Sequence, residues 1–139
     1  MPGVYFPGST KAGGNCLGMP DVCKVPAPPA PPVPTPFPNQ AMCANADKTV
    51  DTVLFENKEV IVEMSEIPSS TGDEAGVAGG VVSGTQAGPV TFKLGSSKVL
   101  AKGKKVAFVT AVTAHNGKNP NMPAGLQVAP SQSKVLVSP

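Results

Sequence analysis

The sequence has 139 residues, which is the length of one domain, and its composition excludes several classes of protein. Only 4% of the residues are aromatic and 14% are charged, whereas glycine and proline number 15 and 17, so the core must be thin and needs a staple or a partner to be rigid. The small net charge of +2 and the scattered lysines disfavour nucleic acid as a partner, and the absence of an apolar run of about 18 residues excludes a spanning helix and predicts no stable membrane insertion.

The N-terminal residues 1–19 are rich in Gly, Ser and Asn and predict an irregular surface segment, of which residues 1–15 are expected to be flexible. They show neither the basic start nor the apolar stretch of a signal peptide. We therefore expect the chain to be cytoplasmic when made, and any export to use a route that reads no signal peptide.

Residues 20–38 follow, with nine prolines in nineteen residues. Because proline fixes φ near about −65° and lacks an amide hydrogen, this segment is expected to run as extended polyproline II chain. It is either a semi-rigid linker or a strap along the domain surface, and the cysteines on both sides of it favour the strap.

Two hairpins are predicted beyond the prolines, because β-branched residues gather around short turns. The first pairs residues 49–55 with 59–64, and the second pairs residues 97–101 with 105–109. Between them lies a segment rich in small residues, 65–88, in which a short helical turn is expected at 72–79.

The two hairpins are also alike in sequence, since residues 53–60 align without a gap to residues 99–106. A third echo occurs where residues 133–136 repeat residues 97–100 letter for letter. Self-similarity of this kind predicts three related strands beginning at Val53, Val99 and Val135, although short matches also arise by chance between strands of similar composition.

Three cysteines and the single histidine form the candidate site: Cys16, Cys23, Cys43 and His115. Three thiolates and one imidazole are the ligands of a closed tetrahedral zinc site, which leaves no position for a catalytic water. One disulfide with a free thiol, or three unrelated buried cysteines, are the alternatives, because the spacing lacks a C-x-x-C knuckle. A reducing compartment disfavours the disulfide, and a thin β domain gains folding free energy from a metal. We therefore expect one structural Zn²⁺.

Motifs for catalysis are missing from the sequence, so the chain is not expected to be an enzyme. There is one histidine, no G-x-S-x-G elbow and no Walker loop. Asp73 and Glu74 are interpreted as partners of a helix dipole rather than as an acid and a base. The alternatives are a zinc-dependent hydrolase with His115 as ligand and Glu74 as base, and a free-standing adhesive or binding domain.

Several short strings, taken in chain order over residues 13–137, resemble the PAAR-like proteins of type VI secretion systems. They are Pro20-Asp21-Val22-Cys23-Lys24, Pro36-Phe37-Pro38-Asn39, the run from Ser69 to Gly76, Val82-Ser83-Gly84-Thr85, the run from Gly95 to Val99, His115-Asn116 and the run from Pro130 to Val135. Cys23 and His115 lie within these strings, whereas Cys16 and Cys43 complete the zinc set by count. The sequence departs from the better-known PAAR pattern, whose ligands are mainly histidines.

The resemblance implies a mainly β fold for residues 1–139, a small cone of short strands and hairpins with a pseudo-three-fold base, a proline-rich strap and little helix. Its broad face is expected to cap a trimeric VgrG-type spike, and its narrow end to hold zinc through His and Cys side chains. The implied function is a structural tip that sharpens the spike for envelope puncture and helps to recruit or deliver effectors. Because nothing follows Pro139, cargo is expected on a separate effector or adaptor chain, and export is expected to occur on the spike into the medium or a target cell.

Overall fold

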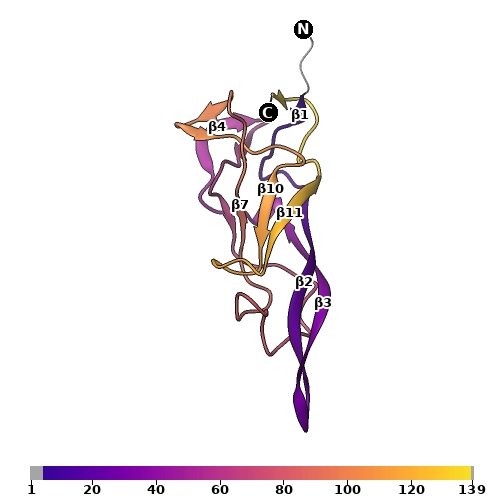
Figure 1. Ribbon diagram of the computed structural model, residues 1–139. Helices are drawn as coiled ribbons and strands as arrows, with labels where there is room; N and C mark the ends of the chain where they lie inside the picture. The colour runs from indigo at the N-terminus through magenta and orange to yellow at the C-terminus, as the bar shows by residue number, and fades with distance from the viewer. Residues whose placement is uncertain (1–4, 139) are drawn as a thin grey trace.

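The computed structural model describes residues 5–138, which form a mainly β cone. A broad end holds both described ends of the chain, and the molecule tapers to a single long hairpin (Figure 1). The strands are β1 (Phe6–Pro7), β2 (Asn15–Ala27), β3 (Ala30–Met42), β4 (Val50–Phe55), β5 (Lys58–Val60), β6 (Glu66–Ile67), β7 (Val90–Phe92), β8 (Leu100–Ala101), β9 (Lys104–Lys105), β10 (Val112–His115), β11 (Met122–Ala129) and β12 (Leu136–Val137). The helical structure within residues 5–138 is one 3₁₀ turn, Cys43–Asn45, and no helix there is long and apolar enough to cross a membrane.

The proline-rich segment forms a β-hairpin instead of the expected polyproline II strap. Its two halves lie in β2 and β3, which pair antiparallel with Cys23 opposite Thr35 and Val25 opposite Val33. The strand order of the main sheet is β3-β2-β11-β10-β7-β6, so β3 is an edge strand. Edge strands tolerate proline, because the missing amide hydrogen faces away from the ladder, and this is why so many prolines enter a sheet here.

Backbone hydrogen bonds at the broad end form a closed ring with approximate three-fold symmetry. The N–H of Ser9 donates to the carbonyl of Ala107, that of Ala107 to Ile61, and that of Ile61 back to Ser9, each at 2.9 Å. Three further bonds between the same segments are related by the same approximate symmetry: the N–H of Lys11 donates to the carbonyl of Glu59 at 3.0 Å, that of Glu63 to Lys105 at 2.7 Å and that of Val109 to Pro7 at 2.9 Å. One chain thus presents three equivalent segments to a common axis.

Each segment of the ring continues into a two-stranded hairpin: β4–β5, β8–β9 and β12–β1. The registers correspond, because Leu54 faces Glu59, Leu100 faces Lys105 and Leu136 faces Pro7. The residues before these leucines are Val53, Val99 and Val135, so the three related strands predicted from the sequence are confirmed. The third hairpin is assembled from the two ends of the chain.

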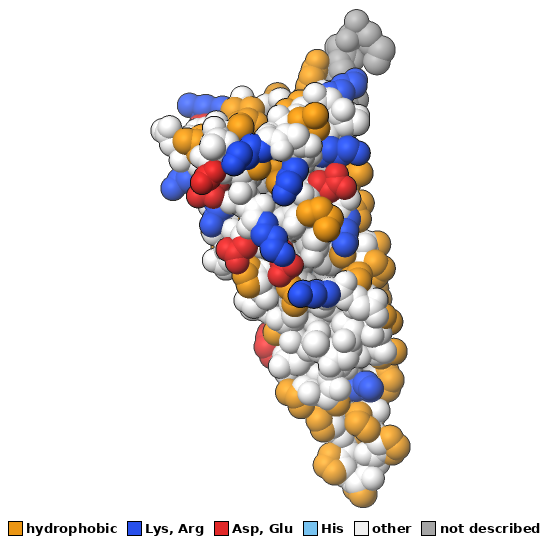
Figure 2. Space-filling model, turned by 90° about the vertical axis from the view of Figure 1, so that its left-hand side faces the viewer, with side chains coloured by type: hydrophobic (Ala, Val, Ile, Leu, Met, Phe, Trp, Pro, Cys, Tyr) orange, Lys and Arg blue, Asp and Glu red, His pale blue; other side chains and the backbone are white. Residues whose placement is uncertain are grey.

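Two hydrophobic clusters support this arrangement. One fills the ring and the hairpins at the broad end, with Val50, Val60, Val62, Ala101, Val106, Phe108 and Val137. The other joins the ring to the main sheet, with Cys16, Ala41, Cys43, Ala46, Ile61, Ile67, Val90, Phe92 and Ala107. Lysine side chains gather over the broad half of the surface and apolar side chains over the narrow end (Figure 2).

Two other expectations for local structure differ from what is observed. Residues 72–79 form successive turns rather than a helix, because Asp73 is drawn into the interior instead of capping a helix. The N-terminal segment is ordered where it is described, since β1 lies in the base and Ser9 and Thr10 are buried; residues 1–4 of the segment expected to be flexible lie outside the described residues.

Candidate metal centre

A buried polar cluster joins the root of the β2–β3 hairpin to the loop of residues 68–89. Asp21 and Cys23 lie two residues apart on β2, and alternation along a strand places both side chains on one face. The loop contributes Asp73, and all three side chains are fully buried. The cluster therefore lies where the cone begins to narrow.

The three side chains are close enough to share one ion. One ligand atom from each of Asp21, Cys23 and Asp73 lies within 4.8 Å of the others. The Cys23 sulfur is 3.6 Å from Oδ1 of Asp21 and 3.7 Å from Oδ2 of Asp73. Two carboxylates with one thiolate can hold a metal, and zinc accepts both oxygen and sulfur ligands.

Three asparagines direct amide hydrogens at this group. Nδ2 of Asn39 donates to Oδ2 of Asp21 at 3.1 Å and to Oδ2 of Asp73 at 3.3 Å. Nδ2 of Asn116 donates to Oδ1 of Asp21 at 3.1 Å and to the Cys23 sulfur at 3.4 Å, and Nδ2 of Asn121 donates to the same Asp21 oxygen. These donors stabilise negative charge on Asp21.

Backbone groups fix the orientation of two of these amides. Oδ1 of Asn116 accepts the N–H of Gly88 at 2.9 Å, and Oδ1 of Asn121 accepts the N–H of Val82 at 2.8 Å. An amide whose oxygen is held in this way must turn its NH₂ group to the other side. The donor set around the acidic group is therefore built into the fold.

The pKa values of Asp21, Cys23 and Asp73 are shifted because two carboxyl groups and a thiol are buried side by side. Burial, and then the hydrogen bond with Asp21, raises the pKa of Asp73 to about 6. Burial alone would raise the pKa of Asp21, but hydrogen bonds from Asp73, Asn121 and Asn116 lower it overall. Burial and the charges of Asp21 and Asp73 raise the pKa of Cys23 to about 12. No lysine within residues 5–138 pairs with these carboxylates, and a bound cation would reverse the preference of Cys23 for its proton.

His115 lies beside the cluster of Asp21, Cys23 and Asp73 and is not one of its three side chains. Its Nδ1 lies 2.7 Å from Oδ1 of Asn39, and its Nε2 lies 2.7 Å from Oγ1 of Thr113. A Cβ added to Gly18 or Gly125 would come within 2.7 Å and 2.3 Å of the ring, so only glycine fits on either side of it. Burial lowers the pKa of His115 to about 4.

Cys16 and Cys43 form a separate pair in the core of the main sheet. Their sulfurs are 4.0 Å apart and both are free thiols. The hydrogen bond with Cys43, and then burial, raise the pKa of Cys16. Cys16 and Cys23 are seven positions apart on the extended β2, which separates them by about 23 Å at about 3.3 Å per residue. The structure therefore divides the four predicted zinc ligands: Cys16 meets Cys43, Cys23 meets Asp21 and Asp73, and His115 reaches that group only through Asn39.

Sequence reasoning missed Asp21 and Asp73 as members of the site, and also the asparagines that surround them. The signal was present, because Asp21, Asn39, Asp73 and Asn116 all lie inside the strings that carry the family resemblance. The interpretation of Asp73 as a partner of a helix dipole left it out of the site, and the count of cysteines favoured Cys16 and Cys43 instead. Neither Glu74, which is exposed and accepts the N–H of Gly72, nor His115 is placed as the alternative hydrolase requires.

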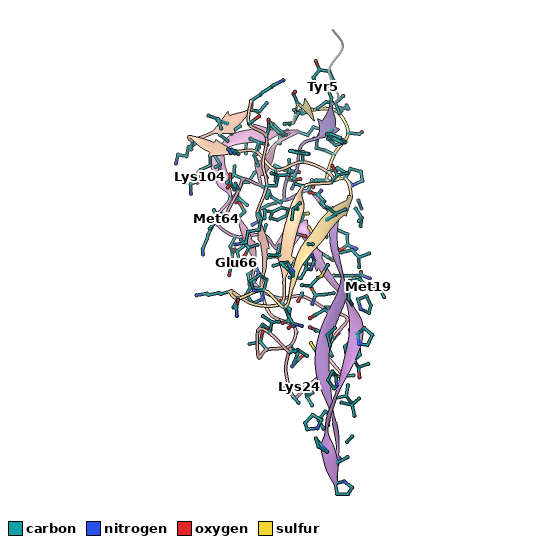
Figure 3. The ribbon with its side chains drawn as sticks, viewed as in Figure 1. Tyr5, Met19, Lys24, Met64, Glu66 and Lys104 are labelled. Carbon is teal, nitrogen blue, oxygen red and sulfur yellow. The ribbon has the colours of Figure 1, made fainter. Side chains whose placement is uncertain are left out.

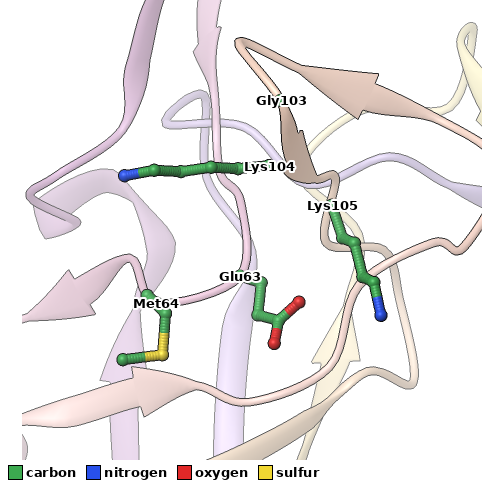
Figure 4. Close-up of a pocket in the computed structure, with 5 residues that line it drawn as sticks. All are labelled: Glu63, Met64, Gly103, Lys104 and Lys105. Carbon is green, nitrogen blue, oxygen red and sulfur yellow. The ribbon is translucent and has the colours of Figure 1, made fainter.

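A pocket at the broad end does not involve these residues. It is lined by Glu63, Met64, Gly103, Lys104 and Lys105, between the segment after β5 and the β8–β9 turn (Figure 4). Met64 and Lys104 lie on the same side of the broad half in Figure 3, well away from Lys24 on the hairpin. The buried acidic cluster lies apart from this pocket, and the side chains of Asp21, Cys23 and Asp73 are closed to solvent.

A β cone with a pseudo-three-fold base and a buried polar cluster defines the chain as a small, mainly β domain. The family model for the toxin PAAR-like domain matches residues 14–122, and the chain belongs to this family. The chain is also 36% identical over 110 residues to the DNase toxin Tse7 of Pseudomonas aeruginosa (strain PAO1). That match covers 75% of this chain but 28% of Tse7, so the chain spans little more than a quarter of the length of this relative. No solved structure matches the chain significantly.

Proposed function

We propose that the chain is the tip that caps a trimeric VgrG-type spike of a type VI secretion system. The observation that supports this most strongly is the cyclic hydrogen bonding of Ser9, Ile61 and Ala107, which gives a single chain an approximate three-fold end. A homotrimer ends in three identical surfaces, and one polypeptide can engage all three equally only if it repeats its own contacts around the same axis. The opposite, tapered end then points away from the spike.

The base offers two kinds of contact to such a partner. Leu54, Leu100 and Leu136 occupy equivalent positions in the three hairpins and are 51%, 57% and 53% exposed. Their strands β4, β8 and β12 each pair on one side only within residues 5–138, so each has a free edge to which a spike strand can add. Equivalent leucines beside equivalent edges provide three similar docking sites.

The docking proposal is tested by mixing the purified chain with a VgrG-type trimer and measuring the mass of the complex. One chain per trimer is expected. A triple variant, Leu54→Asp, Leu100→Asp and Leu136→Asp, should abolish the complex, and each single variant should weaken it by a similar factor. Val128→Asp, at a position that is equally exposed on β11, is the matched control and should bind normally. Normal binding of the triple variant would refute this surface.

One structural Zn²⁺ is the second part of the proposal, and Asp21, Cys23 and Asp73 are the residues that would hold it. Bound there, zinc would neutralise a buried acidic group and tie the hairpin to the loop, so binding free energy would become folding free energy. Binding by Cys16, Cys23, Cys43 and His115 together, as predicted from the sequence, would need the extended β2 to bring Cys16 and Cys23 to one point.

Metal analysis of variants separates these two sets of ligands. We expect one zinc per chain in the wild type, its loss in Cys23→Ser and Asp73→Asn, and its retention in Cys16→Ser and Cys43→Ser. In the metal-free protein, Asp73→Asn should instead stabilise the fold, because it removes one of two buried carboxylates in contact. Loss of zinc from the Cys16 and Cys43 variants would instead favour the ligands predicted from the sequence, Cys16, Cys23, Cys43 and His115.

Delivery of an effector is the third part, and an enzymatic activity remains a second candidate because a relative is named a DNase toxin. We propose that the domain carries cargo out of the cytoplasm when the spike is fired, with no signal peptide needed. Incubation of the purified chain with plasmid DNA and Mg²⁺ tests the enzymatic candidate directly. No cleavage is expected, since the buried centre has no access for a substrate; cleavage that is lost in Asp73→Asn would favour a nuclease.

A further inference from the structure

The edge strand β3 carries proline at every second position along most of its length. The alternating residues are Pro32, Pro34, Pro36 and Pro38. The backbone groups of a strand alternate in the same way, since successive residues direct them to opposite sides. Prolines two positions apart therefore turn their backbone to the same side of β3, which is either the side of β2 or the free side.

The partners of Pro34 and Pro36 on β2 show that both prolines face the free side. Pro34 lies opposite Lys24, and Pro36 lies opposite Val22. Both partners bond to the loop of residues 68–89 instead: the N–H of Lys24 donates to a loop carbonyl at 2.8 Å, and the carbonyl of Val22 accepts a loop N–H at 3.0 Å. They belong to pairs without ladder bonds, in which each residue turns its backbone away from the other. The backbones of Pro34 and Pro36 therefore point outward.

The series of prolines ends where another segment covers the edge. Gln40 is the next outward residue, and it keeps its amide hydrogen. Its N–H donates to the carbonyl of Thr71 at 2.8 Å, and its own carbonyl accepts the N–H of Thr71 at 2.8 Å. Pro38 marks the boundary, because its carbonyl oxygen lies where a Cβ on Gly72 would collide with it. Within residues 5–138, the outward position with a strand partner has a donor, and the uncovered ones do not.

This pattern changes what the edge can bind. An uncovered edge ordinarily accepts another strand, because its outward N–H and C=O groups lack partners. Strand addition uses both kinds of group, since the added strand donates to the edge and accepts from it. At each proline the donor is missing, and ring carbons stand in its place and meet the carbonyl of an incoming strand. The free side of β3 therefore offers acceptors without donors.

The edges at the base differ in this respect. The strands β4, β8 and β12 contain no proline, and each pairs on one side only within residues 5–138. We propose that the alternating prolines close the β3 edge to strand addition, above all by the β3 of a second copy of the chain, so that partner strands pair only at the base. Closure of β3 is a property of the chain alone, whereas the pairing of a spike at the base rests on the proposed function.

Self-association of the isolated chain tests this closure. The double variant Pro34→Thr and Pro36→Thr restores two outward N–H groups at exposed positions, with a residue that favours strands. Two such edges can pair antiparallel about a two-fold axis. The mass measured by sedimentation equilibrium should therefore rise from one chain toward two with concentration. The wild type should stay monomeric over the same range, and each single variant should associate more weakly than the double variant.

A matched control changes the same strand without changing its edge. In the double variant Val33→Thr and Thr35→Val, the altered residues lie opposite Val25 and Cys23 in the ladder with β2, so no outward donor is gained. This control should stay monomeric. Association of the control to the same extent would show that the outward N–H groups are not the cause and would overturn the proposal.

Amide hydrogen exchange then locates the contact. The amides introduced at positions 34 and 36 should exchange rapidly in dilute solution, where they face water, and slowly in the dimer. A double variant that is folded by circular dichroism yet stays monomeric would overturn the proposal, as would protection of the new amides in the dilute monomer. The exposed single variants allow the same measurement if the double variant fails to fold. No spike is present in these experiments, so their failure is distinct from a failure of the docking proposal.

Discussion

At the scale of single residues, Asn39 determines the state of the buried centre. Its Oδ1 can only accept a hydrogen bond, so Nδ1 of His115, 2.7 Å away, must carry a proton. Nε2 then accepts the hydroxyl hydrogen of Thr113, and the ring is neutral with every polar atom bonded. Through its Nδ2 the same asparagine bonds Asp21, Asp73 and Ser70. One amide therefore joins the histidine to the acidic group.

The neutral state of His115 gives a pH prediction. Its folded-state pKa of about 4 lies below the ordinary value of 6.5, so the unfolded chain binds more protons between these values. The contribution of His115 to stability is therefore complete above pH 6.5 and is lost as pH falls toward 4, by about 3 kcal/mol in total. Asp73, with its raised pKa, acts in the opposite sense between 3.8 and about 6.

Proton NMR isolates the histidine, since it is the only one in the chain. The Cε1 proton shift should stay constant from pH 8 to pH 5 and move only near pH 4. A midpoint between 6 and 7 would show that the ring is solvated and contradict its placement. Comparing the pH dependence of unfolding in the wild type and in His115→Gln gives the contribution of His115 to stability.

At the scale of elements, the loop of residues 68–89 is held against β2 by one side chain in particular. Asn121 donates from Nδ2 to the carbonyl of Val22 at 2.7 Å, while its Oδ1 accepts from the backbone of Val82 at 2.8 Å. Backbone bonds from Lys24 to Gly79 and from Val81 to Val22 lie alongside. The loop thereby extends the body of the cone along the hairpin.

Asn121→Ala should release this part of the loop without unfolding the base. Loss of the side chain removes a hydrogen-bond donor from the buried carboxylate of Asp21, which costs about 1–3 kcal/mol. Amide hydrogen exchange at Lys24 and Val81 should accelerate, while exchange at Ile61 in the ring should stay slow. Asn119→Ala, in an exposed position of the same turn, is the control and should change neither. Equal acceleration at Ile61 would show that the loop is not a separate unit.

Sequence reasoning succeeded at this scale where the signal was local. Both predicted hairpins exist because their turns can adopt positive φ, as Asn57 and Gly103 do. It failed where tertiary structure overrides propensity. Residues 72–79 have the caps of a helix, yet burial of Asp73 beside Asp21 prevents one. The prolines indicated an extended segment but not its pairing, because whether a strand lies at an edge depends on the whole sheet.

At the scale of the whole molecule, the repeat in the sequence predicted the symmetry of the base, whereas the count of cysteines and histidine did not predict which side chains lie together. Val53, Val99 and Val135 are equivalent because each directly precedes a leucine that pairs across a hairpin at the same register. Whether Cys16 and Cys23 can meet depends instead on their both lying on one extended strand, which no count reveals. Side chains can bind one metal only if they lie close together in space, and the sequence alone predicts such distances only for residues of the same helix or strand.

The symmetry of the base leads to a prediction for a rearranged chain. The turns Glu56-Asn57 and Lys102-Gly103 both have positive φ at their two central residues, as type I′ hairpins require. The third hairpin has equivalent strands, with Val137 opposite Phe6, but β12 and β1 are not consecutive in the chain and no turn joins them. Joining Val137 to Phe6 through Asn-Gly and opening the chain between Lys102 and Gly103 should therefore exchange one equivalent turn for another.

This permuted chain should fold with a free energy of unfolding within about 2 kcal/mol of the parent, because closing one two-residue loop offsets opening another. It should keep the His115 resonance of the parent and bind a spike trimer as one chain per trimer. A permutant with the same Asn-Gly joint but opened between Ala114 and His115 cuts the centre of the main sheet, so it should not fold. If the first permutant also failed to fold, the three hairpins would be similar in backbone geometry but not interchangeable in the fold. This result would contradict the proposal of three equivalent docking sites.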